Sequence, residues 1–477
     1  MKSKTTVTRS AIVASILFIC TTALAATADW TAYLRGPRHS SFNAGATAFT
    51  PTTATKVHLD WTFPSTALSK PFVASPTVTG GVVYIGSNTG DFYAIDETTG
   101  SEKWHVFLGD VTQDHCFGEG ISSTAAVAAD PSRGGQLTVY VGGGDGYLYA
   151  LRASDGVTVW RKLVADVSTG GYNWASPTLV SGHVYMGISS DCDNPLIRGG
   201  IKDFDQASGT LLHTYWSVPK GSIGGSLWTS PAADGTSVWA TIGNQPDTLS
   251  TRLGDCFAIV RLDAGTFTRQ DRWFVPGTIG TDLDWGSSPT LFDATLNGTV
   301  TRMVGAAQKN GKYYAFRADD LASGPVWSRK IGTSGKEEDV ASRGILLAAA
   351  IWDFDGNRLF VGSNKATTTA PCGNDATALG CMRQLDPATG TPLWQRPLAG
   401  FVMGSPTMCA GGIIAAGTYN INGIDPNFVY LLDASNGAVV KRISPGGPVF
   451  PQPVFADTHL FVATSAGTLT AYSAVGP

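Results

Sequence analysis

Short apolar runs alternate with glycine-containing turns along this chain from about residue 57 to its end. One unit consists of an alternating strand, a turn, a second alternating strand, a turn of the form Asp-x-x-Thr/Ser-Gly, and a strand that carries a tryptophan. Asp91–Gly100 followed by Trp104 is a clear copy. Alternation with a period of two predicts half-buried strands, and glycine-containing turns between them predict antiparallel hairpins. The pattern therefore predicts a repeated antiparallel meander and an all-β protein.

The unit recurs about eight times, and most copies open with Ser-Pro at the first strand. The tryptophan position is occupied by Trp104, Trp160, His213, Trp273, Trp327, Trp394 and Val440. The last copy, which starts near Pro453, stops at Tyr472 before a tryptophan strand, and Val57–Trp61 can supply that strand. A ring that is closed by one strand from each terminus has no open sheet edge. We predict an eight-bladed β-propeller over residues 57–477, closed by the N-terminal segment, with the repeated tryptophans packed between blades.

The amino terminus differs in character from the repeats. Residues 1–25 combine a basic start, an apolar run over residues 11–20 and small residues at 23–25, which predicts a secretory signal peptide. An uncleaved membrane anchor is the alternative, and a lipidated Cys20 is less favoured because Ile19 is large. Residues 26–56 are then an N-terminal extension. This reading predicts a periplasmic or secreted protein with no membrane insertion after removal of the signal.

Composition argues against some classes of partner but does not decide which cysteines form disulfides. The chain has 33 Lys and Arg against 37 Asp and Glu, and it shows no basic stripe. That balance argues against nucleic acid or anionic lipid as a partner. Six of the seven cysteines follow the signal, and Cys372 and Cys381 lie in one loop, where they are the best candidates for a local bridge. No Cys-x-x-Cys-His occurs, so covalent c-type haem is excluded.

The repeat Ala-x-Asp-x-x-Thr-Gly-x-x-x-Trp resembles that of the pyrroloquinoline quinone (PQQ) propellers, the quinoprotein alcohol dehydrogenases. Asp191–Gly199, Leu227–Pro231 and Gln308–Gly311 are similar to segments of the polyvinyl alcohol dehydrogenases among them. The resemblance implies a dehydrogenase that uses PQQ and Ca²⁺ to oxidise secondary or polymeric alcohols by hydride transfer to the quinone. It also implies an external electron acceptor, such as a cytochrome c.

The same resemblance implies roles for particular residues. Trp228 would lie flat under the quinone, although it could also be another packed blade tryptophan. Lys309 would hydrogen-bond the reactive quinone oxygens and stabilise their developing charge, or would be a solvated lysine in an Asn-Gly turn. Asp284, with Asp282 as the fallback, would be the base that takes the hydroxyl proton.

A calcium site is implied beside the quinone, because calcium prefers hard oxygen ligands. Asn244 matches the family's Gly-Asn ligand, although a lone Asn after Gly is also a common turn residue. Asn194 stands roughly where the family has a ligand glutamate, with Asp193 and Asp191 nearby. This cluster could equally be an Asx-rich turn pinned by Cys192.

Two departures from the family keep another class of function open. The adjacent cysteines that clamp the second quinone face are missing, and Cys116 stands alone in about the right blade. An expected arginine is also missing, although Arg198 or Arg343 could bind a cofactor carboxylate. The alternative is a cofactor-free propeller that acts as a binding or assembly platform at the cell envelope. A polysaccharide hydrolase or lyase is a third possibility, for which no acid pair can be identified.

Overall fold

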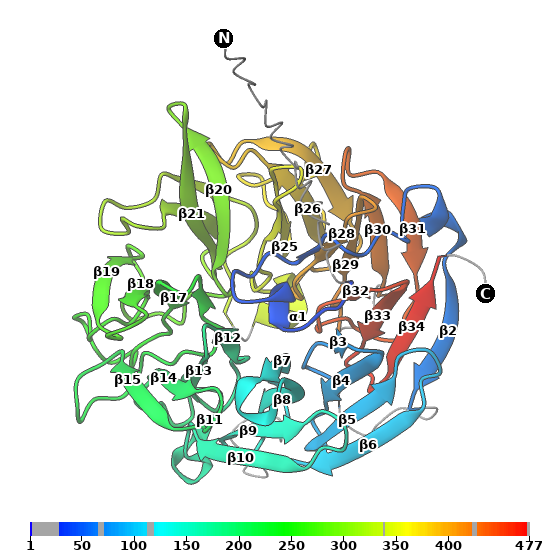
Figure 1. Cartoon of the computed structure of the whole chain (residues 1–477). Coiled ribbons are helices and arrows are strands. Elements are labelled where there is room, and N and C mark those ends of the chain that lie inside the picture. Colours follow the sequence, from blue (N-terminus) through cyan, green and yellow to red (C-terminus); the bar gives the residue numbers. More distant parts are fainter. Residues whose placement is uncertain (2–27, 65–70, 112–118, 337–338, 422–426, 475–477) are drawn as a thin grey trace.

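The computed structural model describes residues 1, 28–64, 71–111, 119–336, 339–421 and 427–474. Apart from residue 1, the predicted signal peptide lies outside these residues, and so does Cys116. Within them the strands form eight sheets that surround a central axis (Figure 1). Each sheet is a four-stranded antiparallel meander, and two sheets carry one extra strand. The predicted eight-bladed β-propeller is confirmed.

Blades 1 to 4 follow one another along the chain. Blade 1 holds β3 (Thr77–Thr79), β4 (Val82–Gly86), β5 (Asp91–Asp96) and β6 (Glu102–Phe107). Blade 2 holds β7 (Ala126–Asp130), β8 (Gln136–Gly142), β9 (Tyr147–Arg152) and β10 (Thr158–Leu163). Blade 3 holds β12 (Thr178–Val180), β13 (His183–Ser190), β14 (Gly200–Asp205) and β15 (Leu211–Trp216), with β11 (Gly171–Tyr172) paired to β13. Blade 4 holds β16 (Ala232–Ala233), β17 (Ser237–Thr241), β18 (Ala258–Asp263) and β19 (Arg269–Phe274).

Blades 5 to 8 complete the ring. Blade 5 holds β20 (Thr290–Leu296), β21 (Thr299–Gln308), β22 (Lys312–Arg317) and β23 (Trp327–Lys330). Blade 6 holds β24 (Ile351–Asp353), β25 (Arg358–Ser363), β26 (Gly380–Leu385) and β27 (Pro392–Leu398). Blade 7 holds β28 (Thr407–Cys409), β29 (Ile413–Gly417), β30 (Val429–Asp433) and β31 (Val439–Ile443), with β1 (Phe42–Asn43) parallel to β28. Blade 8 holds β32 (Val454–Ala456), β33 (His459–Ala463), β34 (Leu469–Ser473) and, as its outer strand, β2 (His58–Phe63).

Helices are short and lie between strands. They are η1 (Tyr33–Arg35), η2 (Thr53–Lys56), η3 (Pro131–Arg133), η4 (Val167–Thr169) and α1 (Val340–Arg343). In the part of the chain that is described, no helix has the length and apolar character needed to cross a membrane.

Strand β2 closes the ring as the sequence predicts. It pairs antiparallel with β34, from His58 opposite Ser473 to Phe63 opposite Leu469. Trp61 is buried, and its indole donates to the carbonyl oxygen of Glu97 in blade 1 at 2.9 Å. The closing strand therefore joins the last blade to the first. In blade 6, Cys372 and Cys381 form the local disulfide that the sequence suggested.

The repeated tryptophan and the turn glycine of the next blade form one packing unit. Trp61 covers Gly100, whose φ is +70° and whose added Cβ would lie 2.6 Å from the indole. Trp104 covers Gly156 in the same way and donates to the carbonyl oxygen of Ala153 at 3.0 Å. A side chain at either glycine would both strain the backbone and displace the tryptophan. This contact explains why the turn and the tryptophan recur together.

The innermost strands are held together by what we call the axial segment, residues 28–43. It crosses the centre of the ring in Figure 1, where it is dark blue. Its backbone or side chains bond to the inner strands of seven blades, at Val78, Val127, Ala233, Leu291, Trp352, Met408 and Phe455. An inner strand is a sheet edge, so its unpaired backbone groups need such partners. The axial segment satisfies them and lies across the axis.

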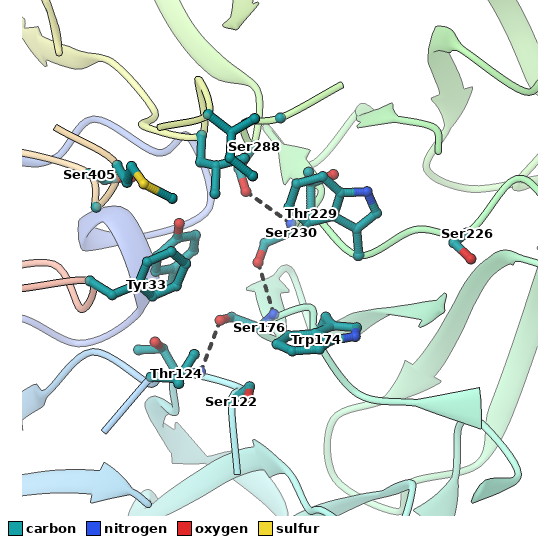
Figure 2. Close-up of a pocket in the computed structure, with 18 of the residues that line it drawn as sticks. Tyr33, Ser122, Thr124, Trp174, Ser176, Ser226, Thr229, Ser230, Ser288 and Ser405 are labelled. Atoms are coloured by element: carbon teal, nitrogen blue, oxygen red, sulfur yellow. Dashed lines mark hydrogen bonds between the residues drawn. The ribbon is translucent and has the colours of Figure 1, made fainter. Parts of the chain in front are cut away.

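The Ser-Pro residues join neighbouring blades around that axis. A backbone N–H group of one blade donates to a side-chain hydroxyl oxygen of the next blade. The donor and acceptor residues are Ser75 and Thr124 (2.9 Å), Thr124 and Ser176 (3.0 Å), Ser176 and Ser230 (2.8 Å), Ser230 and Ser288 (2.9 Å), Ala349 and Ser405 (3.0 Å), and Gln452 and Ser75 (2.9 Å). We call these hydroxyl residues the hydroxyl tier, and Figure 2 shows part of it around Tyr33. The repeated serine thus has a structural role, which is to tie blade to blade.

Candidate functional site

The axis contains a cavity of about 300 Å³ that begins above Tyr33. Its wall comes from the same segment of every blade. All residues of the hydroxyl tier line it, and so do the residues two positions earlier, which face the axis because side chains alternate along an extended chain. This second tier consists of Val73, Ser122, Trp174, Trp228, Gly286, Leu347, Met403 and Phe450. The eightfold repeat thus places one residue of each blade in the second tier, and six of the blades add a hydroxyl residue at the other level of the cavity.

Polar chemistry gathers on one side of the cavity, on blades 3 to 5. Lys309 follows strand β21, and its Nζ lies 2.7 Å from Asp284 Oδ1 and 2.9 Å from Asp282 Oδ1. The indole N–H of Trp228 donates to Asp284 Oδ2 at 2.9 Å. The ammonium of Lys309 also lies 5.4 Å from the centre of the Trp228 ring. Trp228, Asp284 and Lys309, each predicted from a different segment, are therefore in direct contact.

Local backbone contacts hold this cluster in place. The N–H of Lys309 donates to the carbonyl oxygen of Asp284 at 3.0 Å, and Trp285 and Gln308 form an isolated β-bridge. Trp285 is fully buried between blades 4 and 5. Because these contacts fix the backbone of both loops, the carboxylate of Asp284 and the ammonium of Lys309 are pre-positioned.

Burial and charge perturb the titration of the cluster. Burial raises the pKa of Asp284 above its ordinary value, while the charge of Lys309 opposes the rise and that of Asp282 adds to it. Burial alone would lower the pKa of Lys309, but Asp284 and Asp282 raise it above its ordinary value. Lys309 therefore stays charged, and Asp284 is a stronger proton acceptor than an ordinary aspartate would be once it is ionised.

Asp193 and Asn244 lie beside this cluster. Asp193 sits in an exposed turn, yet its carboxyl group lines the cavity, and burial of that group together with Asp284 raises its pKa to about 6. The side chain of Asn244 lies close enough to Asp193 to oppose this rise in its pKa. Asn244 Oδ1 is buried and has no hydrogen-bond partner among the described residues.

The chemical type of these groups suits calcium. The carboxylates of Asp193 and Asp284 and the unpartnered amide oxygen of Asn244 are hard oxygen donors. No set of three or more His, Cys, Asp or Glu residues within the described ranges is spaced to hold a metal by itself. An ion at this place would therefore depend on the Asn244 amide and on ligands from outside the protein.

Other residues singled out in the sequence lie elsewhere. Arg198 is not among the residues that line the cavity, because its guanidinium donates to the carbonyl oxygen of Val218 at 3.0 Å and lies 4.3 Å from the Trp216 ring. Asn194 is exposed and also lies outside the lining. Arg343 pairs with Asp339 at 2.5 Å on the surface. The arginine contacts thus direct both guanidinium groups away from the cavity.

Sequence reasoning missed two features of the cavity wall. Trp174 lines it from blade 3, and it precedes Ser176-Pro177 by the same offset at which Trp228 precedes Ser230-Pro231. That shared offset could have predicted that Trp174 lines the cavity. Cys192 also lines the cavity and is disulfide-bonded. Cys116, the cysteine considered for the quinone clamp, lies outside the described residues.

The fold is that of the eight-bladed propellers of the quinoprotein dehydrogenase type. The quinohemoprotein alcohol dehydrogenase of Comamonas testosteroni superposes with a TM-score of 0.73 over 95% of this chain and 81% of that one, at 17% identity. At this identity the likeness shows the fold.

The chain belongs to the PQQ_2 family, whose model is described as outer membrane protein assembly factor BamB and matches residues 30–241 and 380–476. A polyvinylalcohol dehydrogenase of Pseudomonas sp is 23% identical over 297 residues, which are 54% of this chain and 44% of that protein. An outer membrane protein assembly factor BamB of Shewanella oneidensis is 21% identical over 403 residues, 83% of each chain. The chain thus spans less than half of the dehydrogenase relative and most of the BamB relative.

Proposed function

We propose that this protein is an exported, PQQ-dependent dehydrogenase that oxidises secondary or polymeric alcohols and passes the electrons to an external acceptor. The observation that carries the proposal is the contact of Asp284 with both Trp228 and Lys309 on the wall of the axial cavity. The relatives named as alcohol dehydrogenases support the same chemistry.

Trp228 is half-buried and keeps part of its surface open to the cavity, so it offers an aromatic face to a planar ligand. Lys309 would pair with oxygens at the edge of that ligand, and Asn244 with Asp193 would hold Ca²⁺. Bound PQQ would supply the acceptor for the hydride that leaves the alcohol carbon.

The protein's own part in the reaction is to orient the alcohol and take its proton. Asp284 would accept the hydroxyl proton at a carboxylate oxygen, which converts the alcohol to a carbonyl product as hydride leaves. The charge of Lys309 favours the ionised form of Asp284, and the Trp228 N–H fixes the orientation of the carboxylate.

The test combines the purified protein with PQQ and Ca²⁺ and follows dye reduction with several alcohols. Asp284→Asn should lower kcat by about a hundredfold or more, the usual contribution of a general base. Asp282→Asn is the matched control, since it removes a neighbouring charge and should leave most of the rate. Quinone absorbance checks that both variants still bind PQQ. Equal losses in the two variants would argue against Asp284 as the base.

A second candidate function, a cofactor-free binding or assembly platform at the cell envelope, is favoured by one observation. The BamB relative matches 83% of both chains, whereas the dehydrogenase relative matches about half of this one. Failure of PQQ to bind at micromolar concentration in the presence of Ca²⁺ would support this candidate.

A further inference from the structure

The second tier presents a continuous apolar arc on the side of the cavity away from the charges. Leu347, Met403, Phe450 and Val73 come from blades 6, 7, 8 and 1, and all four line the cavity. Leu347, Phe450 and Val73 are only half-buried, although they lie in the middle of the ring. Protein interiors normally bury such side chains fully. An apolar surface left open inside a cavity is a surface for an apolar ligand group.

This apolar arc begins directly beside the proposed base. Gly286, two residues after Asp284, is the second-tier position between Trp228 and Leu347. A Cβ at Gly286 would clash with the carbonyl oxygen of Leu346 and would lie 3.2 Å from Leu347 Cδ2. A side chain has no space there, because the backbone of Leu346 packs against Gly286, and this close approach brings Leu347 alongside the loop that carries Asp284.

The charges of the cavity are confined to the opposite side. Asp193, Asp282 and Asp284 face one cation, Lys309, which is the single Lys or Arg among the lining residues that the structure describes. An anionic ligand would be repelled here unless a metal ion balanced the excess negative charge. A polyol that lay along the arc would place hydroxyl groups against Leu347, Met403 and Phe450, whose side chains offer no hydrogen-bond partner, while Ser75 and Ser405 of the hydroxyl tier already accept backbone N–H bonds. The wall therefore suits a neutral molecule with one polar end and one apolar end.

We propose that the apolar arc is the specificity surface of the site and that Leu347 is its first specificity-determining residue. The substrate class is a monohydric secondary alcohol whose hydroxyl group meets Asp284 and whose hydrocarbon arm lies along Leu347, Met403 and Phe450. The inference deepens the proposed function and rests on it for the reaction, but the arc as a hydrocarbon-binding surface does not require the cofactor.

The test compares secondary butanol with secondary octanol by calorimetric binding to the cofactor-free protein and by kcat/KM with PQQ and Ca²⁺. Each buried methylene contributes about fourfold in affinity. The wild-type protein should therefore prefer the octanol, and Leu347→Ala should reduce that preference about tenfold or more. Phe450→Ala, on another blade, should reduce it as well, which guards against a folding defect in one variant.

Leu346→Ala is the matched control, because Leu346 is fully buried in the core between blades 5 and 6 and faces away from the cavity. It should lower stability and leave the octanol-to-butanol ratio unchanged. An unchanged ratio in both Leu347→Ala and Phe450→Ala, or an equal shift in Leu346→Ala, overturns the inference. If the octanol-to-butanol binding ratio shifts in the variants but no dye is reduced, the apolar arc is supported and the dehydrogenase function is contradicted. If the alcohols are oxidised but the ratio does not shift, the dehydrogenase function is supported and the apolar arc is contradicted.

Discussion

Asp284 and Lys309 form an ion pair with each other in the wall of the axial cavity. Asp284 is buried, accepts a hydrogen bond from the Trp228 indole and forms an ion pair with Lys309, which also pairs with Asp282. A buried charge without a partner is costly, so such a cluster must be balanced before anything binds. The same contacts leave Asn244 Oδ1 unbonded among the described residues. At this scale the site combines three carboxylates and one ammonium group with an amide oxygen that lacks a hydrogen-bond partner among the described residues.

His39 makes the stability of the protein depend on pH. It is buried in the axial segment, with its Nδ1 2.8 Å from the carbonyl oxygen of Pro289, and burial lowers its pKa to about 4 from the model-peptide value of 6.5. The unfolded chain binds a proton as pH falls through 6.5, whereas the folded chain resists until about 4. Stability from this group is therefore complete above pH 6.5 and is lost towards pH 4, by about 3 kcal/mol in all.

Chemical denaturation at pH values from about 7 to about 4 measures this loss. His39→Gln should flatten the pH dependence, although it also lowers stability at neutral pH. His105→Gln removes an exposed histidine whose pKa is raised by Glu102, so it should not flatten the loss of stability towards pH 4. A wild-type slope in His39→Gln would contradict the assignment.

The contacts between site residues could be predicted only in part. Trp228, Asp284 and Lys309 stand in segments that resemble family motifs, so their convergence followed from the resemblance. Arg198 also follows a motif, but its packing on Trp216 depends on the neighbouring strand β15, which the motif does not encode. Asp193, rather than Asn194, faces the cavity because the turn has positive φ at Cys192 and Asp193. Sequence spacing does not reveal such local turns.

At the scale of elements, the closing strand β2 determines whether eight sheets form a ring. It is the one outer strand that comes from the opposite end of the chain, and Trp61 joins it to blade 1. The need for it was readable in the sequence, because the last repeat lacks a tryptophan strand. The axial segment was not readable, because it carries no repeat and bonds mainly through its backbone.

Trp61→Ala should lower the free energy of unfolding by about 3–5 kcal/mol, the usual cost of truncating a buried tryptophan. It removes the cover of Gly100 and the bond to Glu97 as well as apolar burial. Leu59→Ala on the same strand is the control, since Leu59 is 54% exposed and should cost less than about 0.5 kcal/mol. Urea denaturation of both variants measures the difference, and similar losses would contradict a closing role for Trp61.

At the scale of the whole molecule, the axial segment couples blades that do not touch one another. Asn43 is fully buried, and its side chain donates to the carbonyl oxygens of Ala28 at 2.7 Å and Phe455 at 2.8 Å. It therefore ties the start of the axial segment to blade 8, while β1 pairs with blade 7. Loosening one residue of this segment should affect several blades.

Asn43→Ala should cost about 2–4 kcal/mol, because it leaves buried carbonyl groups unpaired. Hydrogen exchange should increase together in β3, β24, β28 and β32, which are inner strands of four blades. Asn436→Ala, in an exposed turn of blade 7, is the control and should change exchange only locally. Faster exchange confined to β28 would show that the blades respond independently.

The axial segment also determines how a molecule can enter and leave the centre of the ring. Tyr33 lines the cavity on one side of the segment, while Arg35 to Ser40 line a separate hollow on the other side. A molecule that enters above Tyr33 must leave through the opening by which it came, so under the proposed function departing product and arriving substrate would compete for one passage. A long polymer cannot be drawn through the ring from face to face. It can reach Asp284 only by dipping an end or a bend into the cavity.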